Sequence, residues 1–565
     1  MSSDEFIERA LAAHHLQRSR CRDPRQVTAA VFDDLLDQAQ GTAFGRDHGL
    51  RSVRTPADLA AAVPVRDYEA FCGYVGRIRE GEDRVLTVSR PYALHPTSGT
   101  TGRPKYVPTT RHWRDRYRGP GLYAQWGLYL HRLGLSRYHP GNVFDLSWER
   151  AELDDPWTSG DTLPVYSITK RPSSVGPCDW TPPWYFEPWF TVEPGERHLY
   201  TRLRLLASSD VRLVVAVNPS RITALGELLN AELDCLVEDL RNGTVDGRSD
   251  PRTRPDPRTA ARLRTARSFG ARVTLTDLWP GLSLLVCWNS ASARYYRGWL
   301  EQIAPDVPLI PFSTTGTEGI VTLPVDSHTS AGPLAVDQGL FEFVPCDPAD
   351  PGNPLSASVT TYGAEELEHG ATYRLVMSQA NGLYRYDTGD IYRVVGRVGR
   401  LPRLDFEGRA GSVTSFTGEK LTESDVHAAI RSAVGHASVS GGYSVIPVWG
   451  QPPGYTLLME EHEATAPAYS ARFCARVEAE LARLNTEYAD KRRSGRLSPL
   501  RAQVVRAGTY RALTERRVAV GASAAQVKHR WLHPDDSLLR ELEAAPGSPP
   551  PPISNQPPGQ QRSTE

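Results

Sequence analysis

Residues 95–105 read His-Pro-Thr-Ser-Gly-Thr-Thr-Gly-Arg-Pro-Lys, and this is the most informative stretch of the chain. Glycine tolerates positive φ, so successive backbone N–H groups can converge on an anion. Hydroxyl groups add donors, and Lys105 adds positive charge for a phosphate. The Gly-Lys-Ser/Thr ending of a Walker A loop is missing. The stretch therefore indicates either another kind of phosphate-binding loop or a plain turn. In the first case the candidate contacts are Thr97, Ser98, Gly99, Thr100, Thr101, Gly102 and Lys105.

A second polar stretch, residues 313–319, reads Ser-Thr-Thr-Gly-Thr-Glu-Gly and lies between two apolar runs. Glu318 stands where a carboxylate could hold Mg²⁺ against a nucleotide phosphate. The alternative is a solvated acid in a turn. Thr314 and Thr315 are the neighbouring candidates for nucleotide contact.

Two further stretches carry single candidate residues. Asp390 ends the run Asn-Gly-Leu-Tyr-Arg-Tyr-Asp-Thr-Gly-Asp and could accept hydrogen bonds from the vicinal hydroxyls of a ribose. The alternative for Asp390 is a turn-forming aspartate. Lys420 lies in Gly-Glu-Lys-Leu-Thr-Glu, residues 418–423, and the alternative there is an ordinary surface lysine.

The sequence around these stretches predicts an α/β fold. The runs 213–217 and 282–287 are short and wholly apolar, which is typical of strands buried on both faces. Between them, residues 220–243 predict one long amphipathic helix that ends at Asn242-Gly243. Alternation of buried strands and helices favours this class.

The chain is long enough for several domains, since a domain averages about 150 residues. We expect a large domain over residues 1–410, a small one over 411–545 and a disordered Pro-rich tail over 546–565. In the small domain, one helix carries apolar residues on a single face: Phe473, Val477, Leu481 and Leu484.

Composition excludes several function classes. Of 565 residues, 65 are Lys or Arg and 66 are Asp or Glu, for a net charge of −1, so neither a nucleic-acid partner nor a membrane surface is expected. No apolar run is long enough to span a bilayer. The N-terminus lacks an apolar signal core, and the 7 cysteines are scattered without zinc or disulfide spacing. These features predict a cytoplasmic protein.

Residues 139–190 are rich in tryptophan, proline and glycine. They are either an irregular excursion whose aromatic rings fill a core or one wall of a substrate pocket. The tryptophans in question are Trp148, Trp157, Trp180, Trp184 and Trp189.

The order and spacing of the four polar stretches resemble those of adenylate-forming enzymes. In particular the chain resembles the auxin-responsive acyl-acid amido synthetase family, known from plants and also found in bacteria. The resemblance covers most of the chain, and ordinary acyl-CoA synthetases lack the segment Gly-Glu-Lys-Leu-Thr-Glu. Further matching segments are Val63–Glu69, Arg77–Glu82, Leu278-Trp279-Pro280 and Gly521–Lys528.

The resemblance implies a fold with a large N-terminal adenylate-forming domain, built of mixed β-sheets flanked by helices, and a smaller mobile C-terminal α/β domain. It implies a hinge near residues 409–412 and a reaction in which ATP and Mg²⁺ convert a carboxylic acid to an acyl-AMP. An amine then takes the acyl group. By this likeness Lys420 and Lys528 are catalytic, Asp390 and Arg409 bind the nucleotide, and Glu318 binds the metal.

Two departures from the family pattern matter. Thr314 stands where the family has a tyrosine that packs near adenine, and Thr315 stands where it has glycine. Near the C-terminus, Lys528 matches the family's lysine, but the Pro-Arg that should follow is absent.

Two other functions stay open: an acyl-CoA ligase that uses the same adenylate, and a non-catalytic nucleotide-binding relative. The Ala- and Arg-rich composition suggests a bacterium of high genomic GC, where such enzymes serve antibiotic and other secondary metabolism. The tryptophans favour an aromatic or polyene acid. The amine would be an amino acid or an aromatic amine such as an aminocoumarin, and we expect a monomer.

Overall fold

The computed structural model describes most of the chain. The described residues are 3–97, 105–135, 137–147, 163–164, 182–193, 195–268, 272–346, 355–410, 413–414, 419, 421–434, 442–450, 452–461, 467–493, 495, 497–519, 529–533 and 535–544. They form two compact units. The first comprises Met1–Gly411 with Arg511–Lys528, and the second comprises Ser412–Tyr510 with His529–Glu565.

A parallel four-stranded sheet forms one half of the first unit. Its strand order is β3 (Val143–Asp145), β5 (Leu213–Val215), β8 (Leu284–Cys287) and β9 (Leu309–Pro311). Strands β5 and β8 fall in the two apolar runs and are buried throughout, as the sequence predicts. The connections that cross between these strands contain helices, the usual arrangement for parallel pairing.

Antiparallel sheets form the other half. The largest has the order β12 (Gly332–Pro333), β16 (Leu401–Arg409), β15 (Tyr386–Val398), β14 (Thr372–Ser378) and β13 (Leu340–Pro345). A second contains β2 (Lys105–Thr110), β1 (Pro91–Thr97) and β4 (Leu163–Pro164), and the hairpins are β10 (Thr314–Thr315) with β11 (Ile320–Thr322) and β6 (Thr244–Val245) with β7 (Arg248–Ser249).

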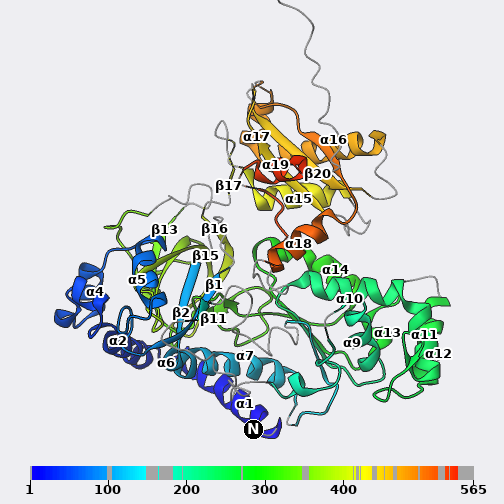
Figure 1. Cartoon of the computed structure of the whole chain (residues 1–565), viewed down its shortest axis with the longest axis horizontal. Coiled ribbons are helices and arrows are strands. Elements are labelled where there is room, and N and C mark those ends of the chain that lie inside the picture. The colour runs from blue at the N-terminus through cyan, green and yellow to red at the C-terminus, as the bar shows by residue number, and fades with distance from the viewer. Residues whose placement is uncertain are drawn as a thin grey trace, which may run out of the picture. The chain divides into compact units, whose positions relative to one another are not determined.

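Helices surround these sheets (Figure 1). The helices of the first unit are α1 (Ser3–Arg20), α2 (Arg25–Ala39), α3 (Ala43–Asp47), α4 (Pro56–Ala62), α5 (Glu69–Arg79), α6 (Arg111–Trp113), α7 (Gly119–Arg132), α9 (His198–Leu206), α10 (Pro219–Ala231), α11 (Leu233–Asn242), α12 (Pro257–Ser268), α13 (Leu275–Leu278) and α14 (Arg297–Ile303). One π-helical turn, η2 (Arg114–Arg118), joins α6 to α7.

Helices α1 and α7 run side by side along the first unit (Figure 1). Gly127 makes this close approach possible, because a Cβ there would lie 2.0 Å from the carbonyl oxygen of Ala10. His14 of α1 is buried at this contact, and its ring centroid lies 5.6 Å from that of His131 of α7.

The family-like segment Val63–Glu69 packs along the start of β15. The N–H of Arg66 donates to the carbonyl of Arg385 at 3.2 Å, and the carbonyl of Arg66 accepts from the N–H of Asp387 at 2.8 Å. The guanidinium of Arg66 lies over the rings of Phe44 and Phe71 at 5.2 and 5.8 Å. The segment thus pairs through its backbone with the residues that precede Asp390.

The second unit is a small α/β arrangement with its own apolar core. Its sheet has the order β19 (Tyr443–Val448), β20 (Gly454–Glu460) and β21 (Arg501–Val505), and a short pair joins β17 (Val413–Thr414) to β18 (Leu421–Thr422). Its helices are α15 (Glu423–Val434), α16 (Pro467–Leu484), α17 (Thr486–Arg493) and α19 (Ser537–Ala544). Helix α18 (Thr509–Ala519) belongs to the first unit from Arg511 onward.

Two sequence predictions about helices are wrong. The long helix over 220–243 is two helices, α10 and α11, which break at Glu232, where the carboxylate accepts hydrogen bonds from Arg197. The end at Asn242-Gly243 is confirmed, since Gly243 has a φ of 70°. In α16, Leu484 does not share the buried face of the other apolar residues, because it is the last residue of the helix and is 37% exposed.

Two of the five tryptophans in the 139–190 region lie in the described part, and both fill the core. Trp184 is fully buried and donates from Nε1 to Asp145 Oδ2 at 3.2 Å, and Trp189 is 3% exposed. The core interpretation therefore holds for these two. Trp148, Trp157 and Trp180, like the tail over 546–565, lie outside the described residues.

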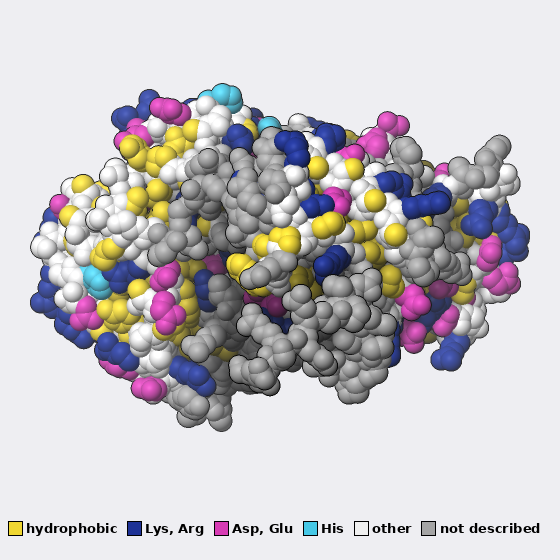
Figure 2. Space-filling model, turned by 90° about the horizontal axis from the view of Figure 1, so that it is seen from above, with side chains coloured by type: hydrophobic (Ala, Val, Ile, Leu, Met, Phe, Trp, Pro, Cys, Tyr) yellow, Lys and Arg dark blue, Asp and Glu magenta, His cyan; other side chains and the backbone are white. Residues whose placement is uncertain are grey.

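Charged side chains of both signs are interspersed on the face drawn in Figure 2, in keeping with the net charge of −1. Across the described residues, none of the helices combines the length and apolarity that crossing a membrane requires.

We predict that His14 makes the first unit sensitive to acid. Neither ring nitrogen of His14 has a hydrogen-bond partner among the described residues. Burial, then His131 and Arg18, lower the pKa of His14 to about 4, from an ordinary value of 6.5. The folded state therefore binds fewer protons than the unfolded state between these values, and stability falls as pH falls through this window.

Between pH 7.5 and pH 5, His14 alone should account for a loss of about 2 kcal/mol in the free energy of unfolding. His14→Leu should therefore lessen the total loss between the two pH values by about this amount, as measured by urea unfolding of the full chain. His15→Gln, at an exposed neighbour on α1, is the control and should retain it. A His14→Leu variant as acid-sensitive as the unmodified chain would contradict the prediction.

Candidate functional site

The hairpin that carries Glu318 follows the last strand of the parallel sheet. β9 ends at Pro311, and the next strands, β10 and β11, enclose Gly316–Gly319. The N–H of Gly316 donates to the carbonyl of Gly319 at 2.9 Å, which closes the turn. Gly319 is required there, because a Cβ would lie within 3.0 Å of the Gln379 side-chain amide. Ligands bind beyond the carboxyl ends of the strands in open α/β sheets, so this hairpin is correctly placed for a site.

Glu318 lies in a charged environment. Its carbonyl accepts from Asn381 Nδ2 at 3.1 Å, which ties the hairpin to the stretch that leads to Asp390. Burial raises the pKa of the Glu318 carboxyl above its ordinary value, the positive charges of Arg409 and Lys105 lower it, and Asp390 raises it. The structure thus brings together Glu318, Asp390, Arg409 and Lys105, which the sequence names from four separate stretches.

Asp390 and Arg409 face each other across the β15–β16 ladder. Arg409 Nε donates to Asp390 Oδ1 at 2.7 Å, and the Asp390 side chain is 18% exposed. The charge of Asp390 raises the pKa of Arg409. Oδ2 of Asp390 accepts no hydrogen bond from a described residue, so one carboxylate oxygen remains for a ligand hydroxyl.

The ends of the predicted phosphate loop are held next to each other. Thr97 ends β1, Lys105 begins β2, and the two residues pair in the antiparallel ladder. Lys105 Nζ lies 5.8 Å from the ring centroid of Tyr68, whose hydroxyl donates to the carbonyl of Tyr106 at 2.8 Å. The residues between them, Ser98, Gly99, Thr100, Thr101 and Gly102, lie outside the described part of the chain.

Sequence reasoning missed Arg118, the last residue of η2. Its Nη1 donates to Thr315 Oγ1 at 2.7 Å and to the carbonyl of Gly316 at 3.0 Å. Burial lowers the pKa of Arg118 to about 10, with the charge of Glu318 acting in the opposite direction. The run Arg-His-Trp-Arg-Asp-Arg-Tyr-Arg over 111–118 gave no signal for which arginine reaches the hairpin.

Thr314 and Thr315 belong to β10 and are half-buried. The N–H of Thr314 donates to Thr322 Oγ1 at 3.3 Å, so this residue closes the hairpin. Thr315 uses its hydroxyl to hold Arg118, a contact that the glycine of the family pattern could not make.

Lys420 and Lys528 lie outside the described residues, but the motif around Lys420 is anchored in the second unit. Glu419 is 1% exposed, accepts from the Tyr455 hydroxyl at 2.6 Å and accepts at its carbonyl from Asn485 Nδ2 at 2.9 Å. Glu423 accepts from the N–H of Trp531 at 2.7 Å. These contacts give two acidic residues of Gly-Glu-Lys-Leu-Thr-Glu a structural role.

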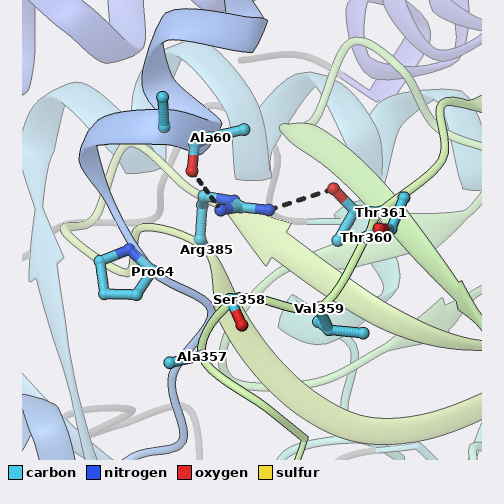
Figure 3. Close-up of a pocket in the computed structure, with 9 residues that line it drawn as sticks. Ala60, Pro64, Ala357, Ser358, Val359, Thr360, Thr361 and Arg385 are labelled. Carbon is cyan, nitrogen blue, oxygen red and sulfur yellow. Dashed lines mark hydrogen bonds between the residues drawn. The ribbon is translucent and has the colours of Figure 1, made fainter.

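One pocket of about 580 Å³ lies elsewhere on the first unit, with Arg385 in its wall (Figure 3). Arg385 Nη1 donates to the carbonyls of Ala60 and Val63 at 2.8 and 2.7 Å, and Nη2 donates to Thr361 Oγ1 at 3.1 Å. Nε and the other Nη2 hydrogen go to Glu342. A guanidinium has five N–H donors, so none is left for a ligand, and Arg385 is a structural residue.

The site suits ATP and Mg²⁺. Within the described ranges, no cluster of three or more His, Cys, Asp or Glu side chains could hold a metal by itself. Mg²⁺ commonly takes one or two protein carboxylates and completes its shell with phosphate oxygens and water. Glu318 provides such a carboxylate, and Lys105, Arg118 and Arg409 provide positive charge around it.

Three family models match the chain. Residues 13–309 match the GH3 family N-terminal domain, residues 332–409 the GH3 family central domain and residues 424–537 the GH3 family C-terminal domain. The chain belongs to the GH3 family. The family predicted from the sequence motifs is therefore confirmed.

Similar GH3 proteins are named as amido synthetases. An indole-3-acetic acid-amido synthetase, GH3.8 of Oryza sativa subsp. indica, is 24% identical over 550 residues, which cover 89% of this chain and 87% of that one. A jasmonoyl–L-amino acid synthetase, JAR6 of Nicotiana attenuata, is 23% identical and covers 92% and 93%. The predicted class of enzyme, an ATP-dependent ligase that forms a carbon–nitrogen bond, agrees with these relatives.

Solved structures confirm the fold class. The GH3.15 acyl acid amido synthetase superposes with a TM-score of 0.72 at 21% identity, over 94% of this chain and 96% of that one. Its complex with 2,4-DB gives a TM-score of 0.70 at 20% identity, over 95% and 96%. This GH3 chain therefore has the expected large adenylate-forming fold with a smaller C-terminal part.

We predict that Glu342 stabilises this GH3 fold without affecting nucleotide use. Glu342→Gln leaves the buried guanidinium of Arg385 uncompensated, since Arg385 is 4% and Glu342 15% exposed. Loss of one partner of a buried pair should lower the free energy of unfolding by about 3 kcal/mol. The KM for ATP should not change.

Urea unfolding and steady-state kinetics of the full chain check both statements. Arg77→Gln is the control, because its ion pair with Glu82 is exposed and should cost less than about 1 kcal/mol. A raised KM for ATP in Glu342→Gln would contradict the structural role of Arg385.

Proposed function

We propose that this GH3 protein uses ATP to join an aromatic or polyene carboxylic acid to an amine. The observation that carries the proposal is the meeting of Glu318, Asp390, Arg409 and Lys105 in one charged site of the first unit. A polyanion with a ribose and a metal ion matches this mixture of carboxylates and cations.

The proposed chemistry has two steps. In the first, an oxygen of the substrate carboxylate attacks the α-phosphorus of ATP, the bond to the β-phosphate oxygen breaks, and pyrophosphate leaves. In the second, the lone pair of the amine attacks the acyl carbon, AMP leaves, and the nitrogen loses a proton. Each step requires positive charge near the phosphate oxygens as their charge develops.

Residues of the chain have separate tasks in this proposal. Asp390, oriented by Arg409, accepts from the ribose hydroxyls, and Lys105 with the Ser/Thr/Gly loop cradles the phosphates. Glu318 would hold Mg²⁺, which supplies charge neutralisation when bound. Lys420 adds its charge at the α-phosphate, and Lys528 is proposed for the second step by the family resemblance.

The proposed substrates follow from the relatives and from composition. The relatives named above act on indole-3-acetic acid and jasmonate, and the proposed acid for this chain is likewise carbocyclic or unsaturated. The Ala- and Arg-rich composition supports a bacterial source and a role in secondary metabolism, including antibiotic biosynthesis with an amino acid or aminocoumarin as amine. We further propose a cytoplasmic monomer.

Acid-dependent exchange of labelled pyrophosphate into ATP tests the proposal. The full chain would be tested without amine against benzoate, cinnamate, indole-3-acetate, sorbate and longer polyene acids. At least one acid should support exchange, and an amine should then give an amide. Product formation with coenzyme A instead of an amine would establish the acyl-CoA ligase alternative, and no exchange with any acid would favour the non-catalytic relative.

Lys420→Ala should lower the rate of adenylation while ATP still binds. One donor aimed at developing charge is worth about 3 kcal/mol in the transition state, so kcat should fall about a hundredfold or more. Pyrophosphate exchange with the best acid measures this, and AMP binding by calorimetry is the control. A change confined to the KM for ATP would contradict the catalytic assignment.

Asp390→Ala should weaken ATP and abolish its preference over 2′-deoxy-ATP, because the carboxylate would no longer accept from the 2′-hydroxyl. The ratio of kcat/KM for the two nucleotides measures the effect. Asp405→Ala, on the paired strand β16, is a matched control outside the site. An unchanged preference in Asp390→Ala would mean that Asp390 is only a turn residue.

A further inference from the structure

Arg118 lies between the two motifs that the sequence singles out for the nucleotide. On one side it contacts Thr315 and Gly316 of the Glu318 hairpin. On the other it is close enough to His95, on the strand that leads into the Ser/Thr/Gly loop, for its charge to lower the pKa of that imidazole, which burial and Arg118 together bring to about 4. Arg118 is therefore a cation of the site itself.

The guanidinium of Arg118 has an unused edge. Both hydrogens of Nη1 are accounted for by Thr315 Oγ1 and the carbonyl of Gly316. Nε and Nη2 donate to no described residue. These two nitrogens form the edge that grips carboxylates elsewhere in this chain: Arg374 uses it for Asp387, with distances of 2.8 and 2.5 Å, and Arg77 uses it for Glu82, with distances of 2.8 and 2.5 Å.

Because Arg118 is partly desolvated, its unused donors favour the binding of an anion. Arg118 has lost enough solvent for its pKa to fall to about 10, yet it stays protonated at neutral pH. The nearby charge of Glu318 compensates it through space without a hydrogen bond. A partly desolvated cation with open donors gains most from an anion that presents two oxygens in one plane.

We propose that the Nε/Nη2 edge of Arg118 binds the carboxylate of the acid substrate during adenylation. The proposal rests on the proposed function and adds a residue to it. A carboxylate matches the planar fork, whereas the phosphates already have Lys105, Lys420 and the metal as proposed partners. A cation at this point also lowers the repulsion between the carboxylate and the α-phosphate that it must approach.

Thr315 orients Arg118 in this proposal. Its hydroxyl and the carbonyl of Gly316 fix Nη1, so they orient the guanidinium and leave the other edge free. Loss of the hydroxyl in Thr315→Val should keep the charge of Arg118 and loosen its direction. Thr315 is thus a positioning residue, and Arg118 is the group that touches the substrate.

The test compares Arg118→Ala, Arg118→Lys and Thr315→Val in the full chain. The acid is the one from the panel that supports the fastest pyrophosphate exchange, and its primary amide serves as a neutral inhibitor of the same shape. In Arg118→Ala the KM for the acid should rise at least about tenfold, because hydrogen bonds to charged groups are worth about 1.5–3 kcal/mol. The KM for ATP and the Kd for AMP should change less than about twofold.

The other two variants separate the effect of the charge of Arg118 from the effect of its orientation. Arg118→Lys should recover part of the acid affinity, because it retains charge but lacks the fork. Thr315→Val should give an intermediate KM for the acid. Inhibition by the primary amide should be unchanged in every variant, so the ratio of acid to amide affinity should fall. Arg111→Gln, an exposed arginine just before η2, is the control and should behave as the unmodified chain.

Three results would overturn the proposal. A raised Kd for AMP with an unchanged KM for the acid would assign Arg118 to a phosphate. A lower thermal midpoint with both substrate constants unchanged would make it a structural anchor of the hairpin. Absence of exchange with any acid in the unmodified chain would refute the proposed function, on which this assignment rests, and this outcome is recognised before any variant is made.

Discussion

The buried ion pair between Arg374 and Asp387 fixes the segment from which the site is built. Arg374 is 3% and Asp387 4% exposed, and the pair joins β14 to the start of β15. Burial of two charges costs free energy that only good geometry and further hydrogen bonds offset. Asp387 Oδ1 also accepts from the N–H of Gly389 at 2.9 Å, so the same carboxylate shapes the irregular part of β15 that precedes Asp390. A pair of this kind makes the direction of Asp390 specific, whatever its net contribution to stability.

The charges of the candidate site, unlike those of the Arg374–Asp387 pair, are not all matched by a hydrogen-bonded partner of opposite sign. In the structural pair, each charge meets its partner at hydrogen-bond distance. In the site, Glu318 is surrounded by Lys105, Arg118 and Arg409, but only Arg409 has a carboxylate partner there, and that partner is Asp390. The raised pKa of Glu318 shows that burial outweighs the nearby cations. A metal ion at Glu318, phosphates at Lys105 and a second anion at Arg118 would satisfy these groups together, which is why an anionic nucleotide with a metal suits the site better than either alone.

Sequence motifs singled out Glu318 and Asp390, which the structure brings near each other, but gave no signal for Arg118 beside them. Glu318 and Asp390 drew attention because glycines stand beside them. Gly316 and Gly319 close the Glu318 hairpin, whereas Gly389, with a φ of 74°, lies in an irregular part of strand β15. Arg409 came only from the family resemblance, since nothing local distinguishes an arginine at the end of a strand. Arg118 could not be found from the sequence, because its proposed role depends on a contact with Thr315, and the two residues are 197 positions apart. Likewise the break at Glu232 accompanies a tertiary contact with Arg197, which periodicity does not record. Periodicity describes one helix face, whereas these features depend on a partner from another element.

Several family-like segments have structural tasks, and the use of their donors tells them apart from site residues. Trp279 of Leu-Trp-Pro donates from Nε1 to the carbonyl of Leu206 at 2.9 Å inside the core, and Arg385 has given all its N–H groups to the protein. Such groups hold the fold and have nothing to offer a ligand, even when a pocket lies beside them, as it does at Arg385. Arg118 differs in one respect only: it is held by Nη1 and keeps its second edge. A half-buried cation that the fold orients but whose donors it does not all use retains a donor pair for a ligand, and for this reason Arg118 is a stronger candidate for substrate contact than the arginine that lines the pocket.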